Sequence, residues 1–526
     1  MKRSFSSSIG KKFACFAALL ISAAVVFTGC ASAVAKEEAK GAAEDKTQEA
    51  EQTVRDSITI AMESEPPTLH PFDHSSVTAG YMNALTYNCL FIIDADTLEP
   101  VSSLCESYEN ISDTEWLFKI YDNINFHDGS HMTAEDVKAS MEYARTYPTT
   151  KNYTSFWTDV EVVDEYTIKV TTDGPYALTL SDMASIKIVP KALIDSGNDF
   201  NQNPIGSGPY RFVQWKLGDC ITFVKNDDYF DKGHQPTITD MTWRIIPEGS
   251  SRTIALEAGE IDVIIETEAN DIARLEEDPD VTVYNVDGTR LNVLAMNNEV
   301  YPFNNVDFRR AVNAAIDRDA VIAVACNGMG TKAVAQTPSV FEGCTEAGAQ
   351  DYDIEKAKEY LERSGVDADG LVFSCIVAND AARRTAEVIQ AGLQEIGITM
   401  EIENMDYATQ LSAIMSGDYQ TSISGYTSSN MCAFLRGFFH SNAINAADIG
   451  RVNDDELDSL IDLSEGQIDR DDRIATYEKA TERLNELSPH LPLYQSVVTR
   501  AASSRLGGFK VSAAGGMRFE DVYWME

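Results

Sequence analysis

The amino-acid sequence predicts a mixed α/β protein, and three local patterns support that prediction. Residues 166–170 alternate between apolar and polar side chains, as a half-buried strand does. Residues 133–136 have the pattern of a helix N-terminus, with an acidic side chain three residues after a capping threonine. Residues 386–402 read as a helix that ends at Gly397 and continues into a strand, an arrangement typical of a helix packed on a sheet.

Length and charge limit the possible functions. The chain has 526 residues, enough for about three domains at roughly 150 residues each. Its 83 acidic and 42 basic residues give a formal net charge of −41. Such a surface repels phosphate backbones and anionic lipid head groups, so we expect no nucleic-acid partner. No uncharged apolar run of about 18 residues follows residue 30, so we expect no membrane-spanning helix there.

The first thirty residues predict a targeting segment. Residues 1–12 are basic and polar, and residues 13–27 form an apolar run that suits the core of a signal peptide. The run ends in Thr28-Gly29-Cys30, which resembles a lipobox, although Phe27 stands where leucine is usual. We therefore predict a signal peptide over residues 1–29 and lipidation of Cys30, with simple secretion as the alternative.

Residues 30–56 predict a spacer. They are rich in Ala, Glu, Lys and Gln and contain no aromatic residue, so they cannot bury enough apolar area to fold alone. We expect them to link a lipidated Cys30 to a globular body that begins near Ser57. The protein would then be extracytoplasmic and held at the cell membrane by its lipid.

Several patterns that could indicate catalysis or a cofactor lack the necessary context. Residues 328–333 match GxGxxA, but a predicted helix precedes them where a dinucleotide site needs a strand. His127 and His131 flank Gly129 in a predicted turn, which argues against zinc. The seven cysteines after Cys30 include no CxxC pair, and we expect most to be buried apolar residues. We predict no catalytic residue, no cofactor and no metal site.

Six segments of the sequence form a recognisable series. They include PIGSGPY at residues 204–210 and ALEAGEID at residues 255–262. The remaining four segments are Trp116–Val137, Pro302–Arg318, Ala386–Ile398 and Leu491–Tyr494. In this order they resemble the signatures of extracytoplasmic solute-binding proteins of ABC importers, in the peptide/nickel class called family 5, and the resemblance covers about residues 57–500.

The resemblance implies a two-lobed α/β fold of the periplasmic-binding-protein type (type II, the large class), with hinge strands and a subdomain inserted in the first lobe. Most signature residues are expected to be structural. Gly206 and Gly208 would permit a tight turn, and Asp317 and Arg318 would form a helix-end ion pair. The predicted ranges are 57–90, 201–288 and 498–526 for lobe I, 91–200 for the inserted subdomain, and 289–497 for lobe II.

The resemblance also implies a function without catalysis. A peptide or similar small solute would bind between the lobes, shift the population toward the closed form, and pass to a membrane permease. Closure excludes water, so few contacts suffice for useful affinity. We expect a monomer that has the solute and the permease subunits as its partners.

Two residues that hold the ends of the peptide in dipeptide binders of this family are absent here, and their absence limits the possible ligands. Dipeptide binders of this family neutralise the peptide ammonium with an Asp in a "GWtgD" run, and here Ser429 occupies that position while Tyr426 replaces the Trp. They bind the peptide carboxylate with an Arg, where the ungapped count here reaches Ile376. Longer or modified peptides, or an uncharged or differently charged solute, therefore remain possible.

Nine residues are the predicted ligand contacts. Those in lobe I follow the segment at residues 69–71, where the family places polar groups that face the ligand. Those in lobe II belong to the anchor loop, residues 426–430, except Arg436, which lies just beyond it and could pair an anionic group. The full set is Ser75, Ser76, Thr78, Tyr81, Tyr426, Ser428, Ser429, Asn430 and Arg436.

Three alternative functions remain open. A ligand-sensing receptor could share the same fold. A nickel-chelate binder needs a His or Arg cluster in the cleft, but the late chain offers only His440 and His490, and we interpret His70 and His74 as loop histidines. A secreted hydrolase would need a converging nucleophile and base or a carboxylate pair, and no nucleophile motif is present.

Overall fold

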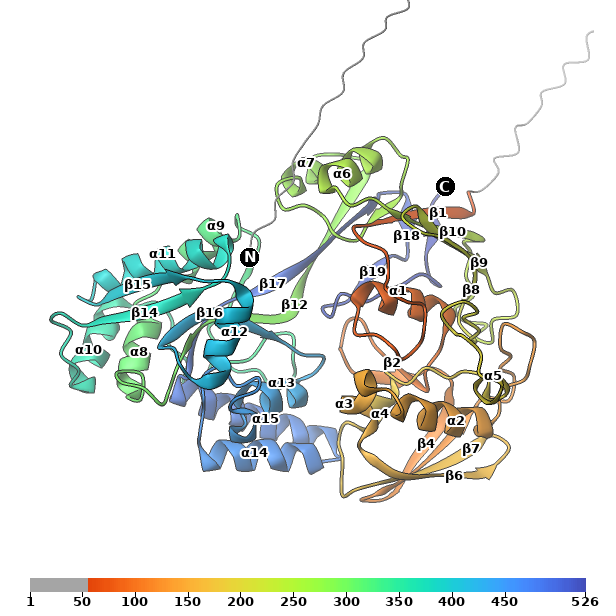
Figure 1. The fold of residues 1–526 in the computed structure, drawn as a ribbon, viewed down its shortest axis with the longest axis horizontal. Coiled ribbons are helices and arrows are strands. Elements are labelled where there is room, and N and C mark those ends of the chain that lie inside the picture. The colour runs from red at the N-terminus through yellow and green to blue at the C-terminus, as the bar shows by residue number, and fades with distance from the viewer. Residues whose placement is uncertain (1–54) are drawn as a thin grey trace, which may run out of the picture. The chain divides into compact units, whose positions relative to one another are not determined.

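The computed structural model describes residues 55–526, which belong to one compact unit. The predicted signal peptide, Cys30 and nearly all of the predicted spacer lie outside the described residues. Within them the protein is mixed α/β, as the sequence predicts, with one large sheet and a separate four-stranded sheet (Figure 1). We keep the names lobe I, inserted subdomain and lobe II for the predicted ranges, whose boundaries stay a prediction.

The large sheet has eleven strands and runs through both lobes. The sheet is mixed: parallel pairs occur in lobe II and in lobe I, and antiparallel pairs lie between them and at the β8 edge. In spatial order its strands are β15 (Thr399–Asn404), β14 (Val372–Val377), β16 (Thr421–Thr427), β12 (Val281–Met296), β17 (His490–Ser503), β11 (Val263–Ile264), β1 (Ser57–Met62), β10 (Asp240–Ile245), β9 (Cys220–Lys225) and β8 (Tyr210–Lys216), with β13 (Thr331–Lys332) beside β17.

Strands β12 and β17 carry the sheet from one lobe to the other (Figure 1). They pair with each other along most of their length. Near one end β17 pairs with β11 of lobe I, and near the other end β12 pairs with β16 of lobe II. The β12–β17 register shifts between Asp287 and Leu291, at the point where the predicted lobe boundary falls.

Lobe I is completed by helices and short strands around a core that contains Trp243 and Tyr210. Arg55 pairs with the buried Asp262 at 2.7 Å and so holds the first described residue against this lobe. The elements are α1 (Val77–Thr86), α6 (Gly249–Glu257), α7 (Ile272–Glu276), β18 (Leu506–Gly507), β19 (Lys510–Val511), β20 (Met517–Arg518) and β21 (Tyr523–Trp524).

The inserted subdomain has its own sheet, in the order β4-β5-β7-β6, and its own apolar core. Thr133 forms a capping box with Asp136 at the start of α2, and Met132 and Val137 are both buried, so the predicted helix start is confirmed. The elements are β2 (Phe91–Ile93), β3 (Pro100–Ser102), β4 (Cys105–Ser112), β5 (Glu115–Ile120), α2 (Ala134–Arg145), α3 (Lys151–Thr154), β6 (Trp157–Asp164), β7 (Thr167–Thr172), α4 (Thr179–Met183) and α5 (Lys191–Ser196).

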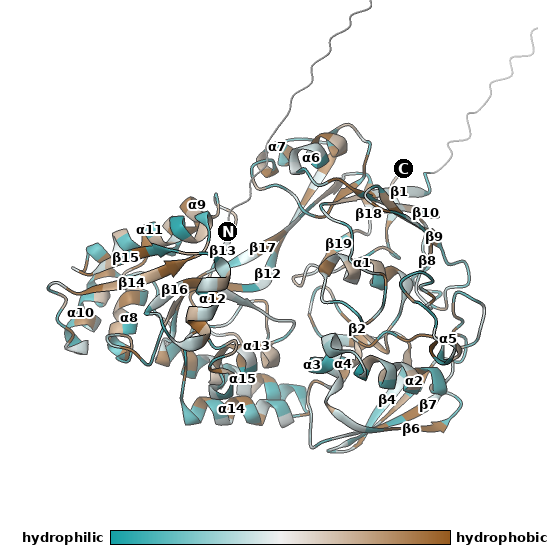
Figure 2. Ribbon diagram, viewed as in Figure 1, coloured by the Kyte–Doolittle hydropathy of each residue, from teal (hydrophilic) through white to brown (hydrophobic). Residues whose placement is uncertain are grey.

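Lobe II packs helices on both faces of its part of the sheet. Strand β14 is largely hydrophobic, whereas the outer helix α10 carries many hydrophilic residues (Figure 2). Gly397 adopts a left-handed φ of +82° between α11 and β15, as the sequence predicts. The helices are α8 (Val306–Ala314), α9 (Arg318–Ala325), α10 (Ile354–Ser364), α11 (Asp380–Gln394), α12 (Tyr407–Ser416), α13 (Met431–Phe439), α14 (Asp455–Gly466) and α15 (Arg470–Leu487).

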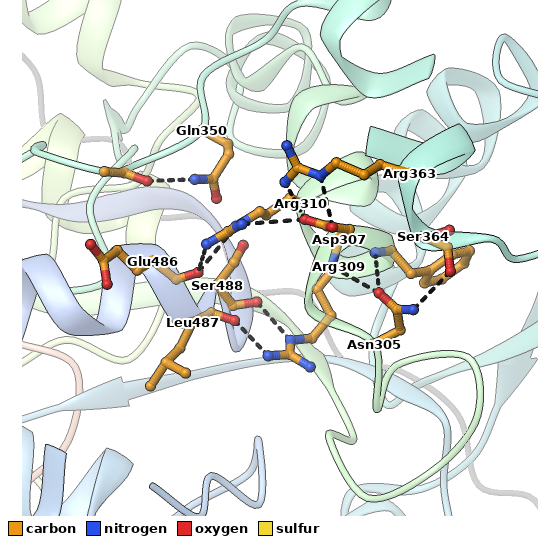
Figure 3. A network of polar contacts seen from close by, with 12 residues as sticks. Asn305, Asp307, Arg309, Arg310, Gln350, Arg363, Ser364, Glu486, Leu487 and Ser488 are labelled. Atoms are coloured by element: carbon orange, nitrogen blue, oxygen red, sulfur yellow. Dashed lines mark hydrogen bonds and ion pairs between the residues drawn. The ribbon is translucent and has the colours of Figure 1, made fainter. Parts of the chain in front are cut away.

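Arginines of α8 close the end of α15 (Figure 3). Arg309 donates to the backbone oxygens of Leu487 at 2.6 Å and Ser488 at 3.1 Å, and Arg310 donates to that of Glu486. The last carbonyls of a helix lack partners within the helix and carry partial negative charge, so cationic donors stabilise them. This signature segment therefore has a structural role.

The predicted ion pair between Asp317 and Arg318 is wrong. The Asp317 carboxylate caps α9 by accepting the backbone N–H groups of Asp319 and Ala320. Arg318 is fully buried and donates to the backbone oxygen of Pro492 at 2.8 Å. Asp317 therefore serves as the helix cap, while Arg318 packs in the core.

Gly206 and Gly208 are needed for close approach rather than for a left-handed turn. A Cβ at Gly206 would lie 2.2 Å from the Thr86 oxygen, and one at Gly208 would lie 2.3 Å from the Leu85 oxygen. Neither glycine has a positive φ. The segment therefore packs directly on the C-terminal end of α1, the helix that carries the predicted lobe I contacts.

Two further observations concern the described part of the chain only. Its seven cysteines are all free, and five of them are buried, in keeping with small apolar residues. None of its helices is long and apolar enough to cross a membrane.

Candidate functional site

The predicted contacts of lobe I lie together at the start of α1. Ser76 is the N-cap: its hydroxyl accepts the backbone N–H of Ala79 at 3.5 Å and contacts the Thr78 hydroxyl at 2.8 Å. Ser75 is exposed beside them. Ser76 and Thr78 therefore stabilise the helix end, which leaves Ser75 free for a ligand contact.

Tyr81 is the most strongly held residue of this set. Its ring stacks on Trp243, with 6.0 Å between centroids, and its hydroxyl accepts a hydrogen bond from Arg500 Nη2 at 3.1 Å. Burial raises the pKa of Tyr81, and the nearby Arg500 charge partly offsets that rise. The phenol therefore stays protonated at neutral pH.

In lobe II, Tyr426 packs inward. Its ring stacks on Phe438 of α13, with 4.9 Å between centroids and planes 6° apart, and burial raises its pKa. A Cβ on Gly437 would lie 2.0 Å from the Tyr426 hydroxyl oxygen, so that glycine makes room for the ring. The Tyr426 ring therefore supports the anchor loop by packing on α13 in the protein interior.

The rest of the anchor loop is polar and uncharged. Asn430 is the N-cap of α13, and its side chain accepts the backbone N–H of Ala433 at 2.9 Å. The Ser428 hydroxyl donates to the Asn430 backbone oxygen at 3.2 Å, and Ser429 is exposed. Of these, Ser429 offers the side chain most open to a ligand.

Arg436 already has its charge matched. Its Nε donates to Glu465 at 2.5 Å and its Nη2 donates to Asp462 at 2.7 Å, both on α14. Two carboxylates next to one guanidinium leave no unmet positive charge. The predicted pairing of Arg436 with an anionic solute would require these contacts to break.

A cavity of about 590 Å³ lies between the inserted subdomain and lobe II. Its volume is in the range of small-molecule sites. Trp116, Tyr108 and Leu178 line it from the inserted subdomain, and Phe341 and Tyr477 line it from lobe II. Asn430 also lines it and is the only one of the nine predicted contacts to do so, which places the anchor loop at its edge.

Charged residues also line this cavity. Glu99 comes from the inserted subdomain, and Glu342, Arg470 and Arg473 come from lobe II. Arg470 pairs with Glu342. Burial and the neighbouring Glu342 raise the pKa of Glu99, while the two arginines partly offset the rise. Two acidic groups therefore meet where the two parts of the protein touch.

Contacts beside the cavity join its two walls. The Ala177 backbone N–H donates to the Glu465 oxygen of α14 at 2.7 Å. Leu98, before β3, is 7% exposed and belongs to the apolar cluster of lobe II. Within residues 55–526, no hydrogen bond joins the predicted contacts of lobe I to those of lobe II, and none of the predicted lobe I contacts lines this cavity.

The histidines are occupied by contacts of their own. His70 Nδ1 accepts the backbone N–H groups of Phe72 and Asp73 at 3.1 Å, and its Nε2 faces two tyrosine hydroxyls. His74 Nε2 contacts Asn83 at 2.7 Å. His490 is fully buried. No group of three or more potential metal ligands was found in the part of the chain that the structure describes.

Sequence reasoning missed the cavity walls from the inserted subdomain. The structure places Ile376, at the position counted for a carboxylate anchor, in the core at 3% exposure. Glu99, Trp116 and Arg473 meet only through the tertiary arrangement, and no local sequence pattern distinguishes them. Arg500, which donates to the Tyr81 hydroxyl, is likewise one residue in a long strand that no local pattern distinguishes.

Comparisons with known proteins agree with this architecture. The family model described as "Bacterial extracellular solute-binding proteins, family 5 Middle" matches residues 99–446, more than half of the chain. The chain therefore belongs to the family 5 bacterial extracellular solute-binding proteins. Proteins of this family serve ABC importers and bind solutes such as peptides, heme or glutathione.

Two curated relatives cover most of the chain. Heme-binding protein A of Haemophilus influenzae is 28% identical over 467 residues, which are 82% of this chain and 85% of that protein. Glutathione-binding protein GsiB of Pectobacterium atrosepticum is 25% identical over 481 residues, which are 88% of this chain and 93% of that protein.

Solved structures share the fold. HbpA2 from Haemophilus parasuis matches with a TM-score of 0.83 at 25% identity and covers 89% of this chain and 100% of that chain. The periplasmic binding protein DppA from Helicobacter pylori, in complex with peptide STSA, matches with a TM-score of 0.69 at 23% identity, covering 90% and 99%. The two-lobed periplasmic-binding-protein fold predicted from the sequence is thus confirmed.

Proposed function

We propose that this chain is the substrate-binding lipoprotein of an ABC importer. It captures a peptide or a similar small solute between its lobes and hands it unaltered to a membrane permease. Lipid on Cys30 holds it at the outer face of the cell membrane, as a monomer. The predicted lobe boundaries and the nine predicted contacts belong to this proposal.

One observation carries the proposal: a cavity of about 590 Å³ has walls from two parts of the chain, in a fold whose lobes are joined by β12 and β17. A solute that contacts both walls stabilises the arrangement in which they lie together. This is the physical basis for signalling occupancy to a permease. The mostly buried cysteines and the hydrogen-bonded His70 and His74 favour binding over catalysis.

Native mass spectrometry of the purified full-length protein tests the proposal. We expect an unmodified peptide-sized molecule to dissociate from it, and deletion of the gene to reduce uptake of that molecule. Release of a chemically altered molecule would indicate an enzyme. Intact uptake together with altered gene expression would indicate a sensing receptor.

Substitution of Ser429 tests the anchor loop. Because Ser429 is exposed in a loop without charged residues, Ser429→Trp should fill the proposed cleft and abolish binding of the co-purifying molecule in calorimetry, with an unchanged melting temperature. Ser412→Trp, at an exposed position on α12, is the matched control. Wild-type affinity in Ser429→Trp would remove the loop from the site.

A further inference from the structure

Arg500 lies where lobe I faces the other parts of the molecule. It stands on β17 opposite Tyr284 of β12, whose ring packs on Phe509 of the C-terminal segment. Its Nη2 donates to the Tyr81 hydroxyl of α1 and would lie 3.5 Å from a Cβ on Gly515. The guanidinium is therefore enclosed by α1 on one side and by the C-terminal segment on the other.

The same face of β12 and β17 continues toward lobe II. Val286 pairs with Val498, two residues along each strand from Tyr284 and Arg500. Val286 packs against the apolar clusters of both lobes, and Ala513 of the C-terminal segment is buried in the cluster of lobe II. A group bound at Arg500 thus lies near the junction of the lobes.

The positive charge of Arg500 lacks an acidic partner. Within residues 55–526 no carboxylate oxygen lies within 4 Å of its guanidinium, whose hydrogen bonds go to the Tyr81 hydroxyl and to the Thr499 backbone oxygen. Burial raises the pKa of Glu266 and the Arg500 charge partly offsets that rise, so Glu266 acts on Arg500 from beyond ion-pair distance, while its carboxylate accepts the backbone N–H of Glu63 at 3.2 Å. The buried Nε of Arg500 has no hydrogen-bond partner among the described residues. A partly buried guanidinium with an unused donor and no carboxylate in contact is unfavourable, so an anionic group in direct contact would be stabilised here.

Around Arg500 and Tyr81, hydrogen-bond donors outnumber the acceptors that the protein supplies. A guanidinium carries more N–H groups than the two contacts of Arg500 use. The Tyr81 hydroxyl accepts from Arg500, so its own hydrogen remains to be donated. In the described part of the chain no acceptor for that hydrogen is found within hydrogen-bond distance. Two neighbouring donors therefore point to a ligand group that only accepts.

We propose that Arg500 and Tyr81 bind a carboxylate group of the captured solute. The planar guanidinium matches a carboxylate in a bidentate geometry, and the phenol adds a second donor. This assignment rests on the proposed function and deepens it. It restricts the ligand to solutes that carry a carboxylate, and it places that carboxylate in lobe I rather than at the anchor loop of lobe II.

Calorimetry with paired ligands tests the assignment. The probes are trialanine against trialanine amide, and glutathione against glutathione diethyl ester, each titrated into the full-length protein. We expect at least one free acid to bind about tenfold more tightly than its neutral partner, because unmatched donors reject a ligand that lacks the acceptor. Arg500→Gln should abolish that preference, and Tyr81→Phe should reduce it several-fold while keeping the stack on Trp243.

Arg505→Gln is the charge-matched control. Arg505 lies over the Trp524 ring, 5.8 Å from its centroid, and is exposed, so its loss should leave the preference unchanged. If Arg500→Gln fails to fold, Tyr81→Phe and Arg500→Lys test the carboxylate assignment instead. Lysine keeps the positive charge but lacks the planar pair of N–H groups that binds a carboxylate, so the preference for the free acid should fall. If the free acids and their neutral forms bind equally well, the carboxylate assignment is overturned while the proposed peptide-binding function stands. Absence of binding by all four probes would contradict the peptide proposal and remove the assignment with it.

Discussion

At the scale of single residues, His490 makes stability depend on pH. Its ring is fully buried, stacks on Phe438 with 4.8 Å between ring centroids, and has no partner for either nitrogen among the described residues. Burial, reinforced by the charge of Arg309, lowers the pKa of His490 to about 3. The folded state therefore requires the neutral ring, whereas the unfolded chain takes up a proton near about pH 6.5.

His490→Phe should remove part of this dependence. A lowered pKa means that the stability is fully present above about pH 6.5 and is lost as the pH falls toward the folded-state value, by about 2 kcal/mol between pH 6.5 and 5. Urea unfolding at the two pH values should show a drop smaller by about that amount in His490→Phe than in the wild type. His131→Gln, at an exposed position, is the control. An identical drop in His490→Phe would show that His490 does not titrate on unfolding.

At the scale of elements, the segment with Gly206 and Gly208 positions α1, and therefore Tyr81. A Cβ at Gly208 would lie 2.3 Å from the backbone oxygen of Leu85, which must move to admit it. We expect Gly208→Ala to lower the free energy of unfolding by about 1–3 kcal/mol, as overpacking does. Urea unfolding measures it.

Gly80→Ala is the matched control for this prediction. Gly80 lies in α1 and nothing stands within 4 Å of its added Cβ. It should raise stability by about 0.5–1 kcal/mol through helix propensity alone. Equal effects of the two substitutions would contradict the close approach at Gly208.

The helices and strands also show which structural features the sequence predicts and which it does not. Periodicity and capping residues are local, so the starts of α2 at Thr133 and of β15 after Gly397 could be predicted from a few neighbours. The role of Gly208 could not, because the atom that requires it belongs to a helix more than a hundred residues earlier. Arg318 was misassigned for the same reason, since its acceptor lies on β17.

At the scale of the whole molecule, the candidate site depends on how distant segments meet. The resemblance of six segments predicts the lobes, yet the cavity joins β4 and β5 of the inserted subdomain to α15 of lobe II. Likewise, Arg500 meets Tyr81 across more than four hundred residues. Contacts between residues so far apart in the sequence follow from the tertiary fold, and no spacing in the sequence indicates them.

The meeting of Glu99 and Glu342 predicts that the contact between the inserted subdomain and lobe II depends on pH. Burial, and then the Glu342 charge, raise the pKa of Glu99. A raised carboxyl pKa means that the contact favours protonated Glu99, so it is strongest at low pH and weakens as the pH rises through that pKa. Glu99→Gln, which stays neutral, should keep the contact at all pH values.

Small-angle X-ray scattering between pH 4 and pH 8 measures this effect, because separation of the two walls enlarges the radius of gyration. We expect the wild type to expand as the pH rises and Glu99→Gln to keep its low-pH dimensions. Glu109→Gln removes an exposed acid of β4 that does not line the cavity, and it should behave as the wild type. Parallel curves for wild type and Glu99→Gln would mean that the carboxyl pair does not control the contact.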